Sequence, residues 1–243
     1  INNDSNSSIL FFSLEMSSEQ LATRILSEQA KISSSDIRKG NLSENDLDNL
    51  VSVSKDILEI PLYIDDTPAI NVGSISSRAR KLKRKNGLGA IVIDYLQLVR
   101  PSKSSKNETR VLEISDITQS LKALAKELNI PIIALSQLSR QVEQRDDKKP
   151  QLSDLRESGS IEQDSDVVMF IFREEYYLEK NEPALGTSDY IEWQQKMEEI
   201  HGQADLLIAK QRHGPTGNIK LSFERKYTRF GNFISKSESD SYE

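Results

Sequence analysis

The sequence contains no cysteine and only two histidines among its 243 residues. Without thiols the chain can form no disulfide bond, no cysteine nucleophile and no cysteine-based zinc site, and two imidazoles are too few for a histidine metal cluster. The absence of cysteine fits a reducing, cytoplasmic compartment best. Long apolar runs are also missing, since the longest obvious one covers only residues 167–172. A bilayer-spanning helix needs roughly 18 apolar residues, so the sequence excludes one and we expect no membrane partner.

The beginning of the chain lacks both an initiating methionine and a signal peptide. Residues 1–8 are polar, with neither a basic nor an apolar segment. We therefore expect a fragment of a longer protein. With 36% hydrophobic and 29% charged residues, the chain can still bury a sizeable core. Its length favours one large α/β domain over two small ones.

Basic residues are locally concentrated although the net charge is −6. Residues 72–110 hold ten lysines and arginines against only two acidic residues. Many of these bases lie on one expected helix, in which Ile75, Ala79 and Leu82 form an apolar stripe and Gly87 is a stop. The stretch is either a solvated helix face or a surface for an acidic partner.

Short apolar runs alternate with amphipathic segments along most of the chain. The expected strands are Ile9–Phe12, Leu62–Ile64, Ala90–Asp94, Pro131–Leu135, Val167–Phe172 and Ala204–Ala209. The expected helices begin at Ser17, at Ser43 and near Val72 and Val111. This alternation predicts an α/β fold with a mostly parallel sheet and helices on both faces. Residues 219–223 and 228–234 alternate apolar and polar side chains, which predicts an antiparallel C-terminal edge.

The segment 174–202 fits this scheme poorly. It carries many charges together with Pro183 and Gly186, and it contains one helix-like stretch around Trp193. We interpret it as a surface insertion in which Trp193 packs locally rather than stacking on a base.

Polar side chains directly follow several expected strands. Glu15, Asp94 and Gln137 each follow an apolar run, and Lys210 and Arg212 follow another. The carboxyl ends of parallel strands are where α/β sheets bind ligands. Two acids, an amide and a basic pair are the components of a nucleoside-triphosphate hydrolysis site, and four apolar residues before Asp94 form a Walker B arrangement, whose carboxylate binds Mg²⁺. An aspartate after a strand is also an ordinary turn former.

Five motifs together are more specific than any one of them. In chain order they are Phe12-Ser13-Leu14-Glu15-Met16, Ile93-Asp94-Tyr95-Leu96-Gln97-Leu98, Ser136-Gln137-Leu138-Ser139-Arg140, the run from Asp154 to Gln163, and the run from Lys210 to Gly217. The sequence resembles the DnaB-type replicative DNA helicases in these motifs, over nearly the whole chain. The resemblance implies a RecA-like ATPase domain over residues 1–243, which assembles as a hexameric ring, translocates on single-stranded DNA and unwinds duplex at the replication fork. It also implies ATP and Mg²⁺ as cofactors, with primase and a helicase loader as possible partners.

The resemblance assigns a role to each polar strand-end residue. Glu15 matches the catalytic carboxylate that polarises the attacking water, and Asp94 matches the Mg²⁺ ligand. Gln137 resembles the sensor that reads the γ-phosphate. Lys210 and Arg212 resemble the basic pair inserted into the neighbouring subunit's nucleotide site. All five residues are thereby expected to contact the bound nucleotide.

Each of these assignments has a structural alternative. Glu15 also suits the N-terminal end of a helix, where the dipole favours an acid. Gln137 is equally explained as a hydrogen-bonded amide at a strand end, and Lys210 and Arg212 as surface charges. His213 has no acidic partner at a recognisable spacing, so we interpret it as structural or exposed.

A second group of residues is expected to contact DNA. By resemblance, Arg156, Glu157 and Gly159 correspond to the loop that follows the DNA backbone. A glycine allows main-chain amides to approach a phosphate closely, and few aromatic residues lie nearby. We therefore expect phosphate contacts with slight sequence preference. The segment 100–110 is a weaker candidate that equally suits a surface loop.

The sequence lacks the family's first requirement, a phosphate-binding loop. No Gly-Lys-Ser or Gly-Lys-Thr occurs anywhere, and the first glycine is Gly40, so no phosphate-binding loop is present. We expect that the domain is truncated at its N-terminus and that this fragment alone is inactive. The alternative is a RecA-like module that forms rings or holds DNA without hydrolysis.

Overall fold

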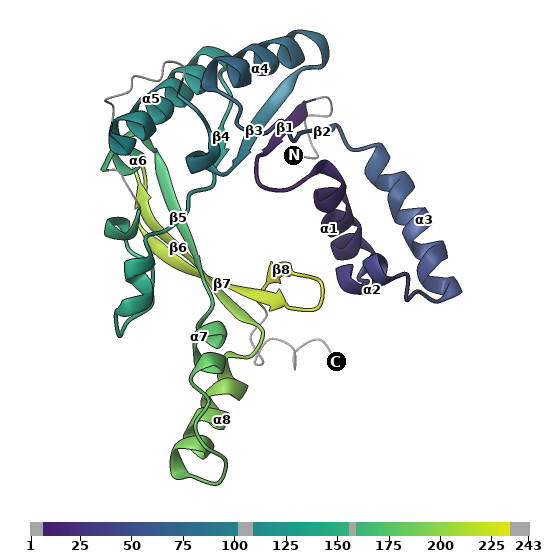
Figure 1. Ribbon diagram of the computed structural model, residues 1–243, viewed down its shortest axis with the longest axis vertical. Helices are drawn as coiled ribbons and strands as arrows, with labels where there is room; N and C mark the ends of the chain where they lie inside the picture. Colours follow the sequence, from purple (N-terminus) through teal and green to yellow (C-terminus); the bar gives the residue numbers. More distant parts are fainter. Residues whose placement is uncertain (1–6, 102–108, 156–158, 234–243) are drawn as a thin grey trace. The chain divides into compact units, whose positions relative to one another are not determined.

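A computed structural model describes residues 7–101, 109–155 and 159–233 (Figure 1). The chain divides into two compact units. The first comprises Ile1–Ser139 and Leu155–Ser165, and the second comprises Arg140–Asp154 and Asp166–Glu243. Each unit contains one four-stranded sheet.

The sheet of the first unit is parallel, with strand order β2-β1-β3-β4. Its strands are β1 (Ser8–Ser13), β2 (Leu62–Asp65), β3 (Leu88–Asp94) and β4 (Ile132–Ala134). The register places Phe12 beside Ile93, and Ile93 beside Ala134. The parallel pairing predicted for these four apolar runs is confirmed.

Two long helices cover the buried face of this sheet. They are α4 (Val72–Asn86) and α5 (Arg110–Leu128), which lie on the same side of the strands in Figure 1. Phe12, Ile91 and Ile93 on the sheet and Ile75 and Ile114 on the helices are completely buried. The apolar side chains recur every three or four residues along both helices, so each helix presents one continuous stripe to the strands. The predicted stop after α4 is confirmed, because Gly87 has a positive φ and donates its main-chain N–H to the Lys83 carbonyl.

Three further helices precede β2, and their starts follow capping chemistry. They are α1 (Ser18–Ala30), α2 (Ser34–Lys39) and α3 (Glu44–Leu58). Ser17 and Gln20 form the predicted capping box of α1, and Ser43 and Asp46 form the equivalent box of α3. The short helix α2 was not expected from the sequence, because one and a half turns give no apolar period to detect.

Half of the basic residues on α4 contact neighbouring elements. Arg78 pairs with Asp65, the last residue of β2, and Arg80 donates to both carboxylate oxygens of Glu127 at 2.7 Å. Lys83 donates to the main-chain oxygen of Leu128. Although burial acts to raise it, the hydrogen bond from Arg78 lowers the pKa of Asp65. This basic helix face is therefore partly structural, which neither sequence interpretation foresaw.

The sheet of the second unit is antiparallel, with strand order β5-β6-β7-β8. Its strands are β5 (Val167–Phe172), β6 (Gln203–Gln211), β7 (Gly217–Glu224) and β8 (Arg229–Asn232). The predicted antiparallel pairing of the last two strands is confirmed. The prediction that residues 167–172 and 204–209 join the parallel sheet is wrong, because β5 pairs with β6 in the antiparallel sense. Along β5, buried residues alternate with exposed ones, but all six are apolar and so conceal the alternation.

A helical hairpin connects β5 to β6 within the second unit (Figure 1). It consists of α7 (Glu174–Lys180) and α8 (Ser188–Ile200). Trp193 packs inside the hairpin, since its indole N–H donates to the Leu178 carbonyl at 2.9 Å and its ring stacks on Tyr190. Residues 174–202 contain eight acidic and two basic side chains, a difference that equals the net charge of −6 of the whole chain. The rest of the chain is therefore electrically balanced.

Candidate functional site

Glu15 lies in the tight turn between β1 and α1. The Ser13 hydroxyl donates to the Met16 carbonyl at 2.7 Å and closes this turn, and Ser17 then caps α1. The main-chain N–H of Leu14 donates to the Asp94 carbonyl at 2.8 Å. These bonds fix the main chain on both sides of Glu15, whose side chain is exposed.

Asp94 is the last residue of β3 and pairs with Ser13 at the end of β1. Burial and the nearby Glu15 carboxylate raise the pKa of Asp94, while Arg24 on α1 acts in the opposite direction. Two carboxylates that repel each other at a strand end favour the binding of a cation between or beside them. Sequence reasoning missed Arg24, because its interaction with Asp94 joins residues seventy positions apart in the chain.

Gln137 follows β4, the neighbour of β3. The main-chain N–H of Leu135 donates to the Ile93 carbonyl, and that of Leu96 donates to the Leu135 carbonyl, both at 2.9 Å. The segments after β3 and β4 are thus joined beyond the last regular strand pair. Glu15, Asp94 and Gln137 all lie at the carboxyl edge of the parallel sheet, as their strand-end positions predict.

A cavity of about 600 Å³ opens in the first unit beside this edge. Leu14, Gln97 and Gln137 line it together with Arg100 and Arg110. Gln97 belongs to the short 3₁₀ turn η1 (Leu96–Leu98), and Arg110 is the first residue of α5. The cavity therefore combines two amides and two guanidinium groups with an apolar wall.

Lys210 and Arg212 belong to the second unit. Lys210 lies within β6 opposite Val168, and Arg212 is the first residue after that strand. The main-chain N–H of Arg212 donates to the Asp166 carbonyl at 2.8 Å, and its guanidinium lies 3.4 Å from the Asp166 carboxylate. Their expected place at the end of a parallel strand is wrong, because β6 is antiparallel to both of its neighbours. The Arg212 side chain is 46% exposed.

Two of the three predicted DNA-contacting residues, Arg156 and Glu157, lie outside the described residues. Gly159 is the first residue of the short helix α6 (Gly159–Asp164), and a side chain added there would meet no atom within 4 Å. On α5, Thr118 donates to the Asp164 carboxylate at 2.5 Å, which holds the end of α6. The residues 103 and 106 of the weaker candidate segment also lie outside the described part.

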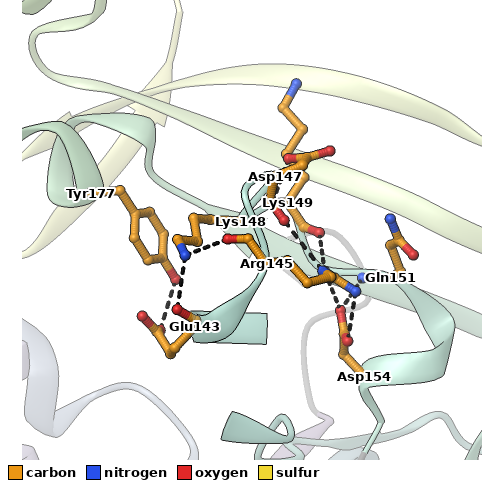
Figure 2. A network of polar contacts seen from close by, with 8 residues as sticks. All are labelled: Glu143, Arg145, Asp147, Lys148, Lys149, Gln151, Asp154 and Tyr177. Atoms are coloured by element: carbon orange, nitrogen blue, oxygen red, sulfur yellow. Dashed lines mark hydrogen bonds and ion pairs between the residues drawn. The ribbon is translucent and has the colours of Figure 1, made fainter. Parts of the chain in front are cut away.

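A polar network surrounds Arg145 in the second unit (Figure 2). It joins two 3₁₀ turns, η2 (Arg140–Gln144) and η3 (Leu152–Asp154). Arg145 donates to both carboxylate oxygens of Asp154, at 2.9 and 2.8 Å, and to the Lys149 carbonyl at 2.9 Å. Tyr177 on α7 donates to Glu143 at 3.0 Å, and burial followed by this bond raises the pKa of Tyr177 to about 12. No periodicity in the sequence pointed to this network.

The residues present fit a divalent cation bound with a phosphate ligand. Among the described residues no group of three or more His, Cys, Asp and Glu side chains could hold a metal by itself. Mg²⁺ commonly uses one or two carboxylates and completes its shell with water and phosphate oxygens. Asp94 with Glu15 beside it meets that requirement. Within the part of the chain that the structure covers, no helix is long and apolar enough to cross a bilayer.

The parallel sheet with acids and an amide at its carboxyl edge is the arrangement of a RecA-like nucleoside triphosphatase core. The family model of the DnaB-like helicase C-terminal domain matches residues 1–232. The chain belongs to this family, which confirms the resemblance found in its motifs.

Known relatives agree with this assignment. The replicative DNA helicase DnaB of Rickettsia typhi is 56% identical over 230 residues, which cover 95% of this chain and 46% of the relative. That of Geobacillus stearothermophilus is 46% identical, covering 93% of this chain and 46% of the relative. The chain therefore spans about half the length of the curated relatives it matches.

Two solved structures share the fold. A DnaB-like replicative helicase, described together with its interactions with primase, superposes with a TM-score of 0.81 at 35% identity, covering 96% of this chain and 52% of that one. The ATPase domain of G40P also gives a TM-score of 0.81, at 36% identity, covering 96% of this chain and 76% of that one. The predicted RecA-like fold class is confirmed.

Proposed function

We propose that residues 1–243 form the RecA-like motor domain of a replicative DNA helicase. In the full-length protein this domain hydrolyses ATP with Mg²⁺, translocates on single-stranded DNA as a hexameric ring and unwinds duplex at the replication fork. The observation that carries the proposal is the shared edge of the parallel sheet, where Glu15 lies close enough to Asp94 to raise its pKa and Gln137 follows the adjacent strand.

Each residue at this edge has a separate task in hydrolysis. Asp94 would hold Mg²⁺, which would supply positive charge beside the bound phosphates. Glu15, exposed and held by a closed turn, accepts a hydrogen bond from the attacking water and polarises it. Gln137 donates its amide N–H to the γ-phosphate, and its neutrality keeps this contact independent of pH. Lys210 and Arg212 reach the nucleotide of a neighbouring subunit, where Arg212 stabilises charge developing on the transferred group.

The same proposal covers the expected binding partners. Arg156, Glu157 and Gly159 contact the backbone of single-stranded DNA, with binding that weakens as salt rises. Primase is a proposed partner because the similar helicase structure is described with its primase interactions. A helicase loader is a further proposed partner.

The test measures ATP hydrolysis and single-stranded DNA binding on the full-length protein. Glu15→Gln and Arg212→Ala are each expected to lower kcat about 100-fold or more while DNA affinity stays within about twofold. The matched controls are Glu19→Gln, an exposed acid in the first turn of α1, and Arg225→Ala, an exposed arginine paired with Glu179. The controls should hydrolyse ATP normally. Unchanged hydrolysis in Glu15→Gln would refute its catalytic role, and no hydrolysis in the unmodified protein would favour the non-hydrolysing ring-forming module instead.

A further inference from the structure

The side-chain amide of Gln97 pairs with the main chain of Gln137. The Gln137 N–H donates to Gln97 Oε1 at 3.2 Å, and Gln97 Nε2 donates to the Gln137 carbonyl at 3.4 Å. Gln97 Nε2 also donates to the Ser136 hydroxyl at 3.0 Å. The primary amide thus donates one hydrogen bond to the main chain and accepts one from it, as a residue in a paired β-strand does. It continues the pairing of β3 with β4 after the regular strand has ended at Ala134.

Gln97 is itself anchored from the opposite side. Arg110, the first residue of α5, donates to the Gln97 carbonyl at 2.5 Å and pairs with Glu113 at 2.7 Å. The start of α5, the turn after β3 and the segment after β4 are therefore linked through one residue. Gln97, Arg110 and Gln137 also line the same cavity.

The chemistry of this contact is specific to an amide of this length. A carboxylate at position 97 accepts the Gln137 N–H but has no N–H to donate to the Gln137 carbonyl. It would place a negative charge against that carbonyl oxygen. A shorter amide has both groups but cannot span the same gap. The contact therefore fixes the peptide of Gln137, and with it the direction in which the Gln137 side chain leaves the main chain.

We infer that Gln97 is a positioning residue for Gln137: its amide holds the Gln137 peptide so that the Gln137 side chain meets the γ-phosphate. This inference rests on the proposed function, because it takes Gln137 as the group that reads the nucleotide. Gln97 itself does not contact the reacting atoms. Its removal should slow hydrolysis without weakening ATP binding.

The experiment compares steady-state ATP hydrolysis of full-length variants in the presence of single-stranded DNA. Gln97→Glu keeps the size of the side chain and removes its N–H donors, and Gln97→Asn keeps the amide and shortens it. Each is expected to lower kcat about tenfold, with KM for ATP within about twofold. Gln119→Glu makes the same chemical change on the exposed surface of α5 and should leave both constants unchanged.

A double variant separates positioning from general damage. If Gln97 acts through Gln137, then adding Gln97→Glu to Gln137→Ala produces no further loss in kcat. An additional tenfold loss in the double variant would overturn the inference, as would normal kcat in both single variants at position 97. If those single variants hydrolyse normally while Gln137→Ala is slow, the sensor role stands and only the positioning role fails. If Gln137→Ala hydrolyses normally, the sensor role of the proposed function fails and this inference fails with it.

Discussion

The ion pair between Arg145 and Asp154 predicts a large loss of stability when the arginine is truncated. Its geometry is bidentate, and the Asp154 side chain is only 6% exposed against 32% for Arg145. After Arg145→Ala, the buried carboxylate keeps a hydrogen bond from the Gln151 N–H at 2.8 Å but loses both guanidinium bonds. Removing one partner of a buried pair costs about 3–5 kcal/mol. We expect about 3 kcal/mol, the lower end of that range, because Arg145 is partly solvated and the Gln151 bond remains.

The assay is thermal unfolding followed by circular dichroism. For a chain of this size, about 3 kcal/mol corresponds to a decrease in Tm of about 6–12 °C. The matched control is Arg80→Ala, which removes an equally bidentate pair with Glu127 whose two side chains are 48% and 49% exposed. Solvent screens such exposed pairs, so the control should melt with the unmodified protein. Equal decreases in Tm for the two variants would show that burial does not determine how much the Arg145 pair contributes to stability.

Two further predictions concern stability. Burial acts to raise the pKa of Glu175, but hydrogen bonding from Arg173 and the charge of His201 lower it. The stabilisation from this carboxylate is therefore present above the ordinary glutamate pKa of about 4.3. It is lost as pH falls through the lowered value. Glu175→Gln should therefore flatten the acid side of the pH–stability curve. Unfolding can be followed by the emission of the single tryptophan, Trp193 on α8. An unchanged acid transition would contradict the linkage. Phe12→Ala empties a fully buried site between the sheet and its covering helices and should cost about 3–5 kcal/mol in denaturant unfolding, whereas a loss below about 1 kcal/mol would mean that the core refills the space.

Local sequence patterns predicted most of the helices and strands of the first unit. The apolar runs of β1 and β3 and the three-four periodicity of α5 are each strong enough to define an element without its neighbours. The capping boxes at Ser17 and Ser43 fixed two helix starts to the residue. The strand-end rule then brought Glu15, Asp94 and Gln137 to one edge, because the direction of parallel strands alone decides that placement.

The remaining features depend on contacts between residues far apart in the chain. The direction of β5 was misjudged because its exposed face is as apolar as its buried face, so the sequence carries no period-two signal. Gln97 was visible in a motif, but its bonds with Gln137 join residues forty positions apart. Arg145 lies in an irregular segment of 3₁₀ turns, where neither propensity nor periodicity indicates which carboxylate it will meet.

The helical hairpin of α7 and α8 changes how the net negative charge of this chain is interpreted. A net charge of −6 suggests a protein repelled by polyanions, but residues 174–202 account for all of it. In physiological salt the field of an exposed charge fades within about 8 Å. Any repulsion of a polyanion by this excess charge is therefore a short-range property of residues 174–202. The remaining residues of the sequence carry equal numbers of acidic and basic side chains, so their mean charge is zero.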